Sequence, residues 1–252
     1  GDEGGTGGSG ARGEESLEQG ALIICEVGGR PCEEDRQYVS DELDSIARRV
    51  RESLADNLAA SSMQVVAAIN RVMFDELGFK GNEGEYYDPR NSFVTEVLRR
   101  RMGIPITLAL VYVCVAERLG LRVQGVNAPS HFLLRVRDTM GGGTGGDGHY
   151  FIDVFNKGKV MSLDGVQVLL TALGWAPFGR IQLPECPPRS LFARMLRNLT
   201  AVYQAAGQTS SFILCLSQLL EVVRATDGES VEHYEQQIDE YRWTSSARIL
   251  NP

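Results

Sequence analysis

The segment from Pro105 to Leu119, PITLALVYVCVAERL, is apolar around most of a helix circumference. Proline suits the first turn of a helix, because its missing N–H would have no helical partner there. Gly120 then supplies a residue that readily ends a helix. A helix that is apolar on most sides must be buried on several sides. We therefore expect a central helix around which the other elements pack.

The apolar period changes after this helix. Three short runs rich in β-forming residues, at 121–126, 131–137 and 150–155, alternate in part between apolar and polar side chains. We expect a small antiparallel sheet packed on the central helix, so the predicted fold class is α+β. The glycine-rich connection at 138–148 is interpreted as an insertion in a hairpin loop, because added loop length costs little closure entropy. His149 beside it is expected to be exposed.

Helices are predicted before the central helix as well. Apolar residues three and four apart indicate one helix from Asp35 to Asn57 and a second from Ser61 or Ser62 to Leu77. A short helix should follow Asn91 or Ser92 and end at three arginines, 99–101. The helix dipole favours cations at that end, and a contact with an anion or a partner is the alternative explanation.

The C-terminal part predicts a helical hairpin. A helix near 163–173 is followed by a region rich in proline and glycine, which marks a boundary. Helices at 190–206 and 210–225 then meet at Gly207. The expected domains are a disordered or poorly ordered N-terminal segment (1–34), the core (35–178), a helical region (179–228) and a tail or cap (229–252).

Charge and cysteine usage restrict the classes of partner. The 252 residues carry 25 Lys and Arg against 33 Asp and Glu, a net charge of -8, which opposes binding to nucleic acid or anionic lipid. The apolar runs fall short of the roughly 20 residues that a membrane span needs. Five scattered cysteines and three dispersed histidines predict neither a zinc site nor another cofactor. We expect a reducing intracellular compartment: the cytosol, or an organelle stroma if a targeting peptide has been removed.

His131 and Asp153 are the candidate catalytic pair. His131 begins the strand that follows the central helix, and Asp153 lies on the next predicted strand. Adjacent antiparallel strands can bring the two side chains together. In Cys-His-Asp sites the histidine exchanges a proton with a cysteine at a helix N-terminus, and the aspartate orients the imidazole. The alternative is that His131 packs without chemistry and that Asp153 accepts backbone N–H groups.

A nucleophile is missing from this arrangement. The residues around the helix start, Met102 to Thr107, include no thiol. Cys114 lies nine residues beyond Pro105, which places it roughly 13 Å along the helix. Thr107 or Ser92 offers a hydroxyl, which is a weak nucleophile unless a base activates it.

The loop FKGNEGEYYDPRN, at 79–91, has the composition of a binding loop. It combines turn-forming residues with two adjacent tyrosines. A polar aromatic loop beside a buried helix start would form a usable groove. The predicted groove residues are Tyr86, Tyr87, Asn91, Gly103, Pro105, Thr107 and Asn127. The alternative is that the tyrosines and Asn91 only support the loop.

Five blocks in one order, FDELGFKGN, YYDPRNS, RRRMGIPITLALVYVCVAERLGL, GVNAPSHFLLRV and FIDVFNKGK, resemble the SirB-type branch of the transglutaminase-like superfamily. The resemblance runs from about residue 35 to about residue 225. It implies a papain- or transglutaminase-like core, with a central buried helix on a small antiparallel sheet, followed by tetratricopeptide-like helices. Related domains occur in F-box proteins that select substrates for ubiquitin ligases.

The resemblance also assigns roles to residues. The catalytic cysteine of the superfamily matches Pro105, its histidine matches His131 and its aspartate matches Asp153. The departure at Pro105 is typical of this branch. It implies a noncatalytic module that binds or scaffolds a protein partner. The alternative is an atypical hydrolase or transamidase, in which His131 acts as base on water or on a hydroxyl.

Overall fold

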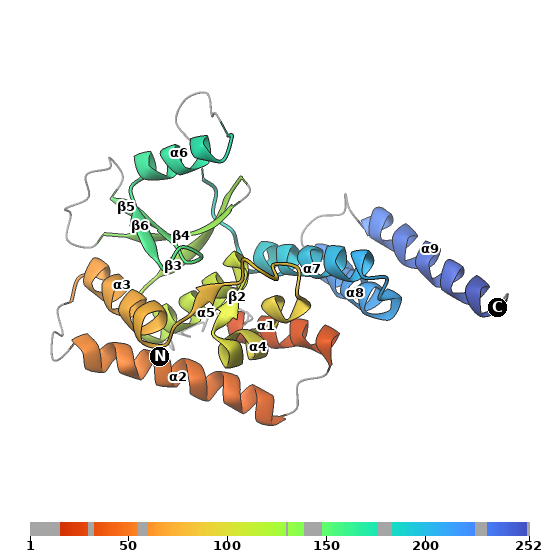
Figure 1. Ribbon diagram of the computed structural model, residues 1–252, viewed down its shortest axis with the longest axis horizontal. Coiled ribbons are helices and arrows are strands. Elements are labelled where there is room, and N and C mark those ends of the chain that lie inside the picture. The colour runs from red at the N-terminus through yellow and green to blue at the C-terminus, as the bar shows by residue number, and fades with distance from the viewer. Residues whose placement is uncertain are drawn as a thin grey trace, which may run out of the picture.

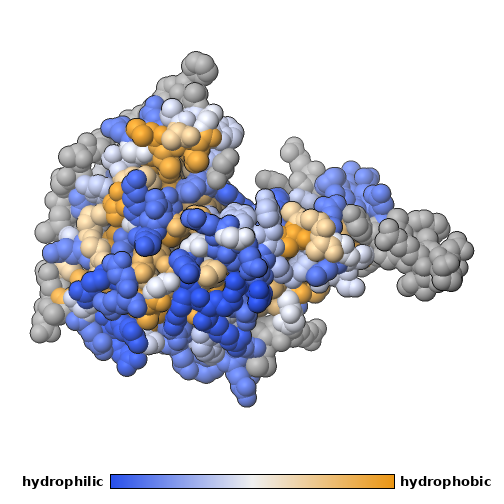
Figure 2. All heavy atoms as spheres, in the orientation of Figure 1, coloured by the Kyte–Doolittle hydropathy of each residue, from blue (hydrophilic) through white to orange (hydrophobic). Residues whose placement is uncertain are grey.

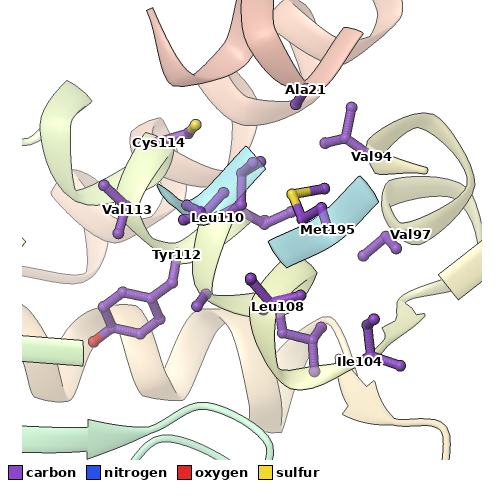
Figure 3. Packing of buried hydrophobic residues seen from close by; sticks show 14 of the residues in the cluster. Ala21, Val94, Val97, Ile104, Leu108, Leu110, Tyr112, Val113, Cys114 and Met195 are labelled. Carbon is purple, nitrogen blue, oxygen red and sulfur yellow. The ribbon is translucent and has the colours of Figure 1, made fainter. Parts of the chain in front are cut away.

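Helix α5 (Pro105–Arg118) lies at the centre of the structure (Figure 1). The computed structural model describes residues 16–29, 33–54, 60–129, 131–138, 148–175, 183–224 and 231–250, the last ten by their backbone alone. Every side chain from Ile106 to Ala116 is buried. Facing side chains come from α1 (Leu17–Cys25), α4 (Val94–Arg100) and α7 (Pro188–Ala205), as Figure 3 shows for Ala21, Val94 and Met195. The prediction of a central buried helix is confirmed.

The main sheet separates α5 from α6. Its four strands are antiparallel and follow the chain order: β3 (Val123–Ala128), β4 (His131–Arg137), β5 (His149–Asp153) and β6 (Lys159–Met161). One face contributes Phe132 and Ile152 to the apolar cluster of α5. The other contributes Leu133 to a second cluster with α6 (Leu163–Ala172) (Figure 1). The α+β prediction is confirmed, whereas β6 was not predicted.

His149 differs from the prediction. It is half-buried at the start of β5, because it pairs with Arg137 at the end of β4. The glycine-rich connection predicted before it lies mostly outside the described residues.

The predicted N-terminal helices are present as α2 (Glu33–Leu54) and α3 (Ser62–Asn70). Ser61 caps α3 in a reciprocal capping box with Gln64, which satisfies two N–H groups of the first turn. A π-helical turn, η2 (Arg71–Glu76), continues α3 to Leu77. Gly78 then adopts a φ of 72°, the left-handed conformation that glycine tolerates best.

Two short strands connect the 79–91 loop to the start of α5. β1 (Lys80–Gly81) pairs in parallel with β2 (Met102–Gly103), so that Gly81 lies opposite Gly103. A 3-10 turn, η3 (Pro89–Ser92), ends the loop and leads into α4. These pairings fix the loop beside the first turn of the central helix.

The three arginines at the end of α4 bind carboxylates within the chain. Arg99 forms a salt bridge with Asp35, and Arg101 with Glu42, both on α2. The guanidinium of Arg100 lies 3.5 Å from the carboxylate of Asp88 in the loop. These contacts join α4 to α2 and to the loop, in addition to any favourable interaction with the helix dipole.

Helix α1 corrects the prediction that the chain is disordered or poorly ordered over 1–34. Ser16 caps this helix, and Ala21 and Ile24 are buried. A Cβ on Gly20 would lie 2.2 Å from the ring of Phe192 on α7, so glycine allows a close approach. The apolar stripe of α1 is short. The helix is stabilised by packing on α7, which is distant in the sequence. A 3-10 turn, η1 (Glu26–Gly28), follows, and residues 1–15 lie outside the described residues.

The C-terminal region is helical. α7 and α8 (Thr209–Arg224) form the predicted hairpin, with Gly207 in the left-handed conformation between them. α9 (Val231–Leu250) packs on α8 and buries Ile238, so the predicted tail or cap contains a helix. Among the described residues, no helix is both long enough and apolar enough to cross a membrane.

Candidate functional site

The first turn of α5 contains no thiol, and its one hydroxyl is buried. Ile104 precedes it without a side-chain cap, and the half-buried Pro105 occupies the first helical position. The hydroxyl of Thr107 is fully buried and donates a 2.8 Å hydrogen bond to the carbonyl oxygen of Asn91. Thr107 therefore fastens the loop to the helix, and its oxygen is not available at the surface.

His131 and Asp153 lie side by side, as the strand order predicts. The Nε2 atom of His131 is 3.0 Å from Oδ2 of Asp153, and the two side chains are 16% and 4% exposed. The contact has the distance of a hydrogen bond without its directional geometry. Asp153 also accepts the N–H of Asn156 through Oδ1 at 3.2 Å, which fixes its carboxylate in the turn after β5. A base acting on a substrate would use the other ring nitrogen, Nδ1.

Arg194 on α7 binds the end of the β3–β4 hairpin. Its guanidinium donates to the side-chain oxygen of Asn127 at 3.1 Å and to the carbonyl oxygen of His131 at 3.2 Å. It also stacks over the ring of Phe132, 5.4 Å from the ring centre. The sequence analysis missed Arg194, because its partners lie on strands far from it along the chain. No local pattern singles it out, because Arg194 lies away from the apolar stripe that contains Phe192, Leu196 and Leu199.

Asn91 organises the tyrosine loop from inside. Its amide nitrogen donates to the carbonyl oxygens of Glu85 and Tyr86, at 2.7 and 3.2 Å. Its amide oxygen accepts from Asn82 at 3.0 Å and from Arg100 at 3.3 Å. Because Asn91 is fully buried, it supports the loop and is not a surface contact.

The two tyrosines lie at the surface of this loop. Tyr86 is 42% exposed and Tyr87 is 76% exposed, and their rings meet edge to face with centroids 5.4 Å apart. Partial burial raises the pKa of Tyr86, and the positive charge of Arg194 opposes that shift. Tyr86 therefore lies within electrostatic reach of the guanidinium that holds the His131 strand.

The predicted groove residues separate into two groups. Asn91, Gly103 and Thr107 are buried and connect the loop to α5. Tyr86 and Tyr87 are exposed, while Pro105 and Asn127 are half-buried. The first group therefore supports the loop from inside, and the second group lies at or near the surface.

A hollow of 390 Å³ lies between this loop and the C-terminal half of α7. Tyr87 and Pro89 form one wall, and Ala201, Val202 and Gln208 are among the residues on the other. Neither His131 nor Asp153 lines it. Figure 2 shows apolar surface over the α7–α8 region on the viewed face. This hollow is therefore separate from the histidine–aspartate pair.

The described cysteines do not replace the missing thiol. Cys25, Cys114, Cys186 and Cys215 are buried and form no disulfide. Burial raises the pKa of all four, and that of Cys114 and Cys215 reaches about 12. Buried thiols with raised pKa values are poor nucleophiles near neutral pH. Within the described residues, no group of three or more His, Cys, Asp or Glu could hold a metal ion.

Comparison with known proteins shows the family to which the chain belongs. The transglutaminase-like superfamily matches residues 37–197, which include the central helix, the loop and the sheet. The chain belongs to the transglutaminase-like superfamily. The matched segment contains His131, Asp153 and Arg194. No solved structure matches the chain.

Relatives of this superfamily member come from bacteria and animals. A UPF0162 protein of Xylella fastidiosa is 37% identical over 163 residues, or 63% of this chain and 56% of the relative. A UPF0162 protein of Pseudomonas aeruginosa is 30% identical over 203 residues, or 79% of this chain and 70% of the relative. Human F-box only protein 21 is 32% identical over 225 residues, or 81% of this chain and 35% of the relative. The chain thus spans about half the length of the Xylella relative and about a third of the human one.

Proposed function

We propose that this transglutaminase-like domain is a noncatalytic module that binds or scaffolds a protein partner. One observation carries the proposal: α5 begins with Pro105. The resemblance described above matches this position to the catalytic cysteine of the superfamily. A proline has no group that can attack a carbonyl. His131 and Asp153 would then be retained from a Cys-His-Asp site that has lost its nucleophile.

Two further observations support the proposal. The hydroxyl of Thr107 is buried and hydrogen-bonded to the loop, so it is poorly placed to act as a substitute. The described cysteines are buried thiols whose pKa values are raised. These features disfavour a relocated nucleophile.

We infer that the partner binds at the tyrosine loop and the adjacent hollow. Tyr87 is largely exposed, and tyrosine is enriched at protein interfaces because its ring is apolar and its hydroxyl is polar. We also propose membership of the SirB-type branch, with α7 and α8 as a tetratricopeptide-like hairpin. The buried unpaired cysteines support a reducing compartment.

A capture experiment tests the binding surface. The immobilised chain is compared with a Tyr86→Ala/Tyr87→Ala variant and with a control, Val168→Ala/Leu173→Ala, which removes exposed apolar side chains at α6 instead. We expect a partner that the control retains and the tyrosine variant loses, and the purified partner should show the same difference. An identical set of partners for all three proteins would remove this surface as the binding site.

A second candidate function follows from the 3.0 Å contact between His131 and Asp153. A carboxylate beside Nε2 can orient an imidazole so that Nδ1 acts as a base on water. The chain would then be an atypical hydrolase. Its signature is turnover of a fluorogenic amide or ester that His131→Ala abolishes.

A further inference from the structure

A second groove lies between three helices, α1, α7 and α8. Its volume is 450 Å³, within the range of small-molecule sites in proteins. Its lining includes the buried side chains of Phe192 and Leu196 and, at the surface, those of Ile23 and Leu214, which are 48% and 41% exposed. It shares no described residue with the hollow beside Tyr87. An apolar ligand would be stabilised here, because binding removes its surface and these side chains from water.

The charged residues of this groove already have partners. The carboxylate of Glu26 lies 3.9 Å from the guanidinium of Arg36, and that of Glu221 lies 2.9 Å from Arg224. Arg189, the third ionisable residue of the described lining, also interacts within the chain. A charged ligand would lose its hydration and find no unpaired charge among the described lining residues. The groove therefore favours an uncharged ligand.

Gln218 gives the groove one unsatisfied acceptor. Its side-chain nitrogen donates to the carbonyl oxygen of Ile23 at 3.1 Å, which fixes the orientation of the amide. Its side-chain oxygen is closed off from water and accepts no hydrogen bond within the described part of the chain. An unsatisfied buried acceptor is unfavourable, so a ligand that donates a hydrogen bond to it would be preferred.

We propose that the groove between α1, α7 and α8 binds an uncharged, mainly aliphatic molecule that carries one hydroxyl or N–H group. The aliphatic part packs against Ile23, Phe192 and Leu196. The donor binds the oxygen of Gln218 when the exposed side chain of Leu214, one turn earlier on the same face of α8, rotates toward solvent. This site lies apart from the surface of the proposed protein-binding function and does not depend on it.

Four small probes of similar length test the assignment with the full chain. 1-Octanol carries the expected donor, heptyl methyl ether has the same composition without a donor, and octanoate and octylammonium carry a charge. Binding is followed through the methyl NMR signals of Ile23 and Leu214, which localise the probe in the groove.

Two variants and two matched controls complete the experiment. Gln218→Met removes the acceptor at similar size, and Leu214→Glu places a charge at the exposed rim. Gln167→Met and Val168→Glu make the same changes on α6, where Gln167 is half-buried and Val168 is exposed. The Ile23 signal reports on binding in all four proteins.

We expect 1-octanol to shift the Ile23 signal and to bind about tenfold or more tightly than either charged probe, because the groove does not compensate a buried charge. It should bind roughly threefold to tenfold more tightly than the ether, as expected for one hydrogen bond. Gln218→Met should remove this preference over the ether. Leu214→Glu should weaken 1-octanol binding about tenfold or more, whereas both controls should leave it unchanged.

Three results would overturn the inference: no probe shifts the Ile23 signal, the charged probes bind as tightly as 1-octanol, or the preference over the ether survives Gln218→Met. Sedimentation velocity supplies a fourth. A dimer that Leu214→Glu dissociates and Val168→Glu does not would show that a second copy of the chain covers this face instead of a small molecule.

Discussion

The ring of Phe155 occupies the place where a side chain at Gly81 would begin. A Cβ on Gly81 would lie 2.3 Å from the ring, closer than two carbon atoms can approach. Gly81 pairs with Gly103 just before α5, and Phe155 lies two residues beyond Asp153. This contact brings the start of the central helix to the strand that carries the aspartate.

Gly81→Ala should therefore destabilise the fold. The ring of Phe155 must move, and overpacking of this kind costs about 1–3 kcal/mol of unfolding free energy. Gly84→Ala is the matched control, since no atom lies within 4 Å of its ideal Cβ and its φ is not positive. Urea unfolding measures both variants. Equal midpoints would show that the contact does not constrain the fold.

Asn91→Ala should loosen the tyrosine loop. The change removes four hydrogen bonds of a fully buried amide and leaves Asn82 and two carbonyl groups without that partner. We expect a loss of roughly 2–4 kcal/mol in unfolding free energy. Asn156→Ala, at an exposed amide after β5, should change stability by less than about 0.5 kcal/mol. Similar losses for both variants would contradict this role for Asn91.

Arg194→Ala should release the end of the β3–β4 hairpin. Asn127 and the carbonyl group of His131 both lose a donor, so their strand ends should exchange amide hydrogens faster. Arg194→Lys should restore protection only in part, because an ammonium group lacks the planar fork of a guanidinium. The His131 imidazole resonances should shift in the same order. Unchanged exchange and unchanged resonances would show that Arg194 does not position the histidine.

Stability should fall above pH 8 because of the buried thiols. Cys114 and Cys215 have pKa values of about 12 in the folded chain, against a reference of 9.0. Between these values the unfolded chain binds fewer protons than the folded chain, so a rise in pH favours unfolding. From pH 8 to pH 10 the two thiols should together cost about 3 kcal/mol. Urea titrations measure this slope, and Cys114→Ala should reduce it by about half. A slope unchanged by that substitution would contradict the assignment.

Local sequence patterns were sufficient to predict much of the fold. The apolar circumference of α5 and the alternation of three strands depend on neighbouring residues, so the sequence indicates both directly. Helix α1 was missed because its apolar stripe is short and is stabilised by Phe192, which is distant in the chain. Strand β6 was missed because it contains only three residues.

The candidate site could be predicted only in part. The order of His131 and Asp153 on adjacent strands was enough to predict their contact. The bonds of Arg194 and the buried bond of Thr107 depend on how distant elements pack, and no local pattern encodes that packing. Asn91 was predicted as a groove residue, with support of the loop as the alternative, and its four amide hydrogen bonds inside the fold agree with the alternative.

A turnover assay tests the absence of catalysis most directly. Wild type and His131→Ala are compared on fluorogenic amidase and transamidase substrates, with circular dichroism confirming that the variant is folded. We predict that the wild type is no faster than His131→Ala and that both match the rate in buffer alone. Wild-type turnover above the buffer rate that disappears in folded His131→Ala would contradict the account.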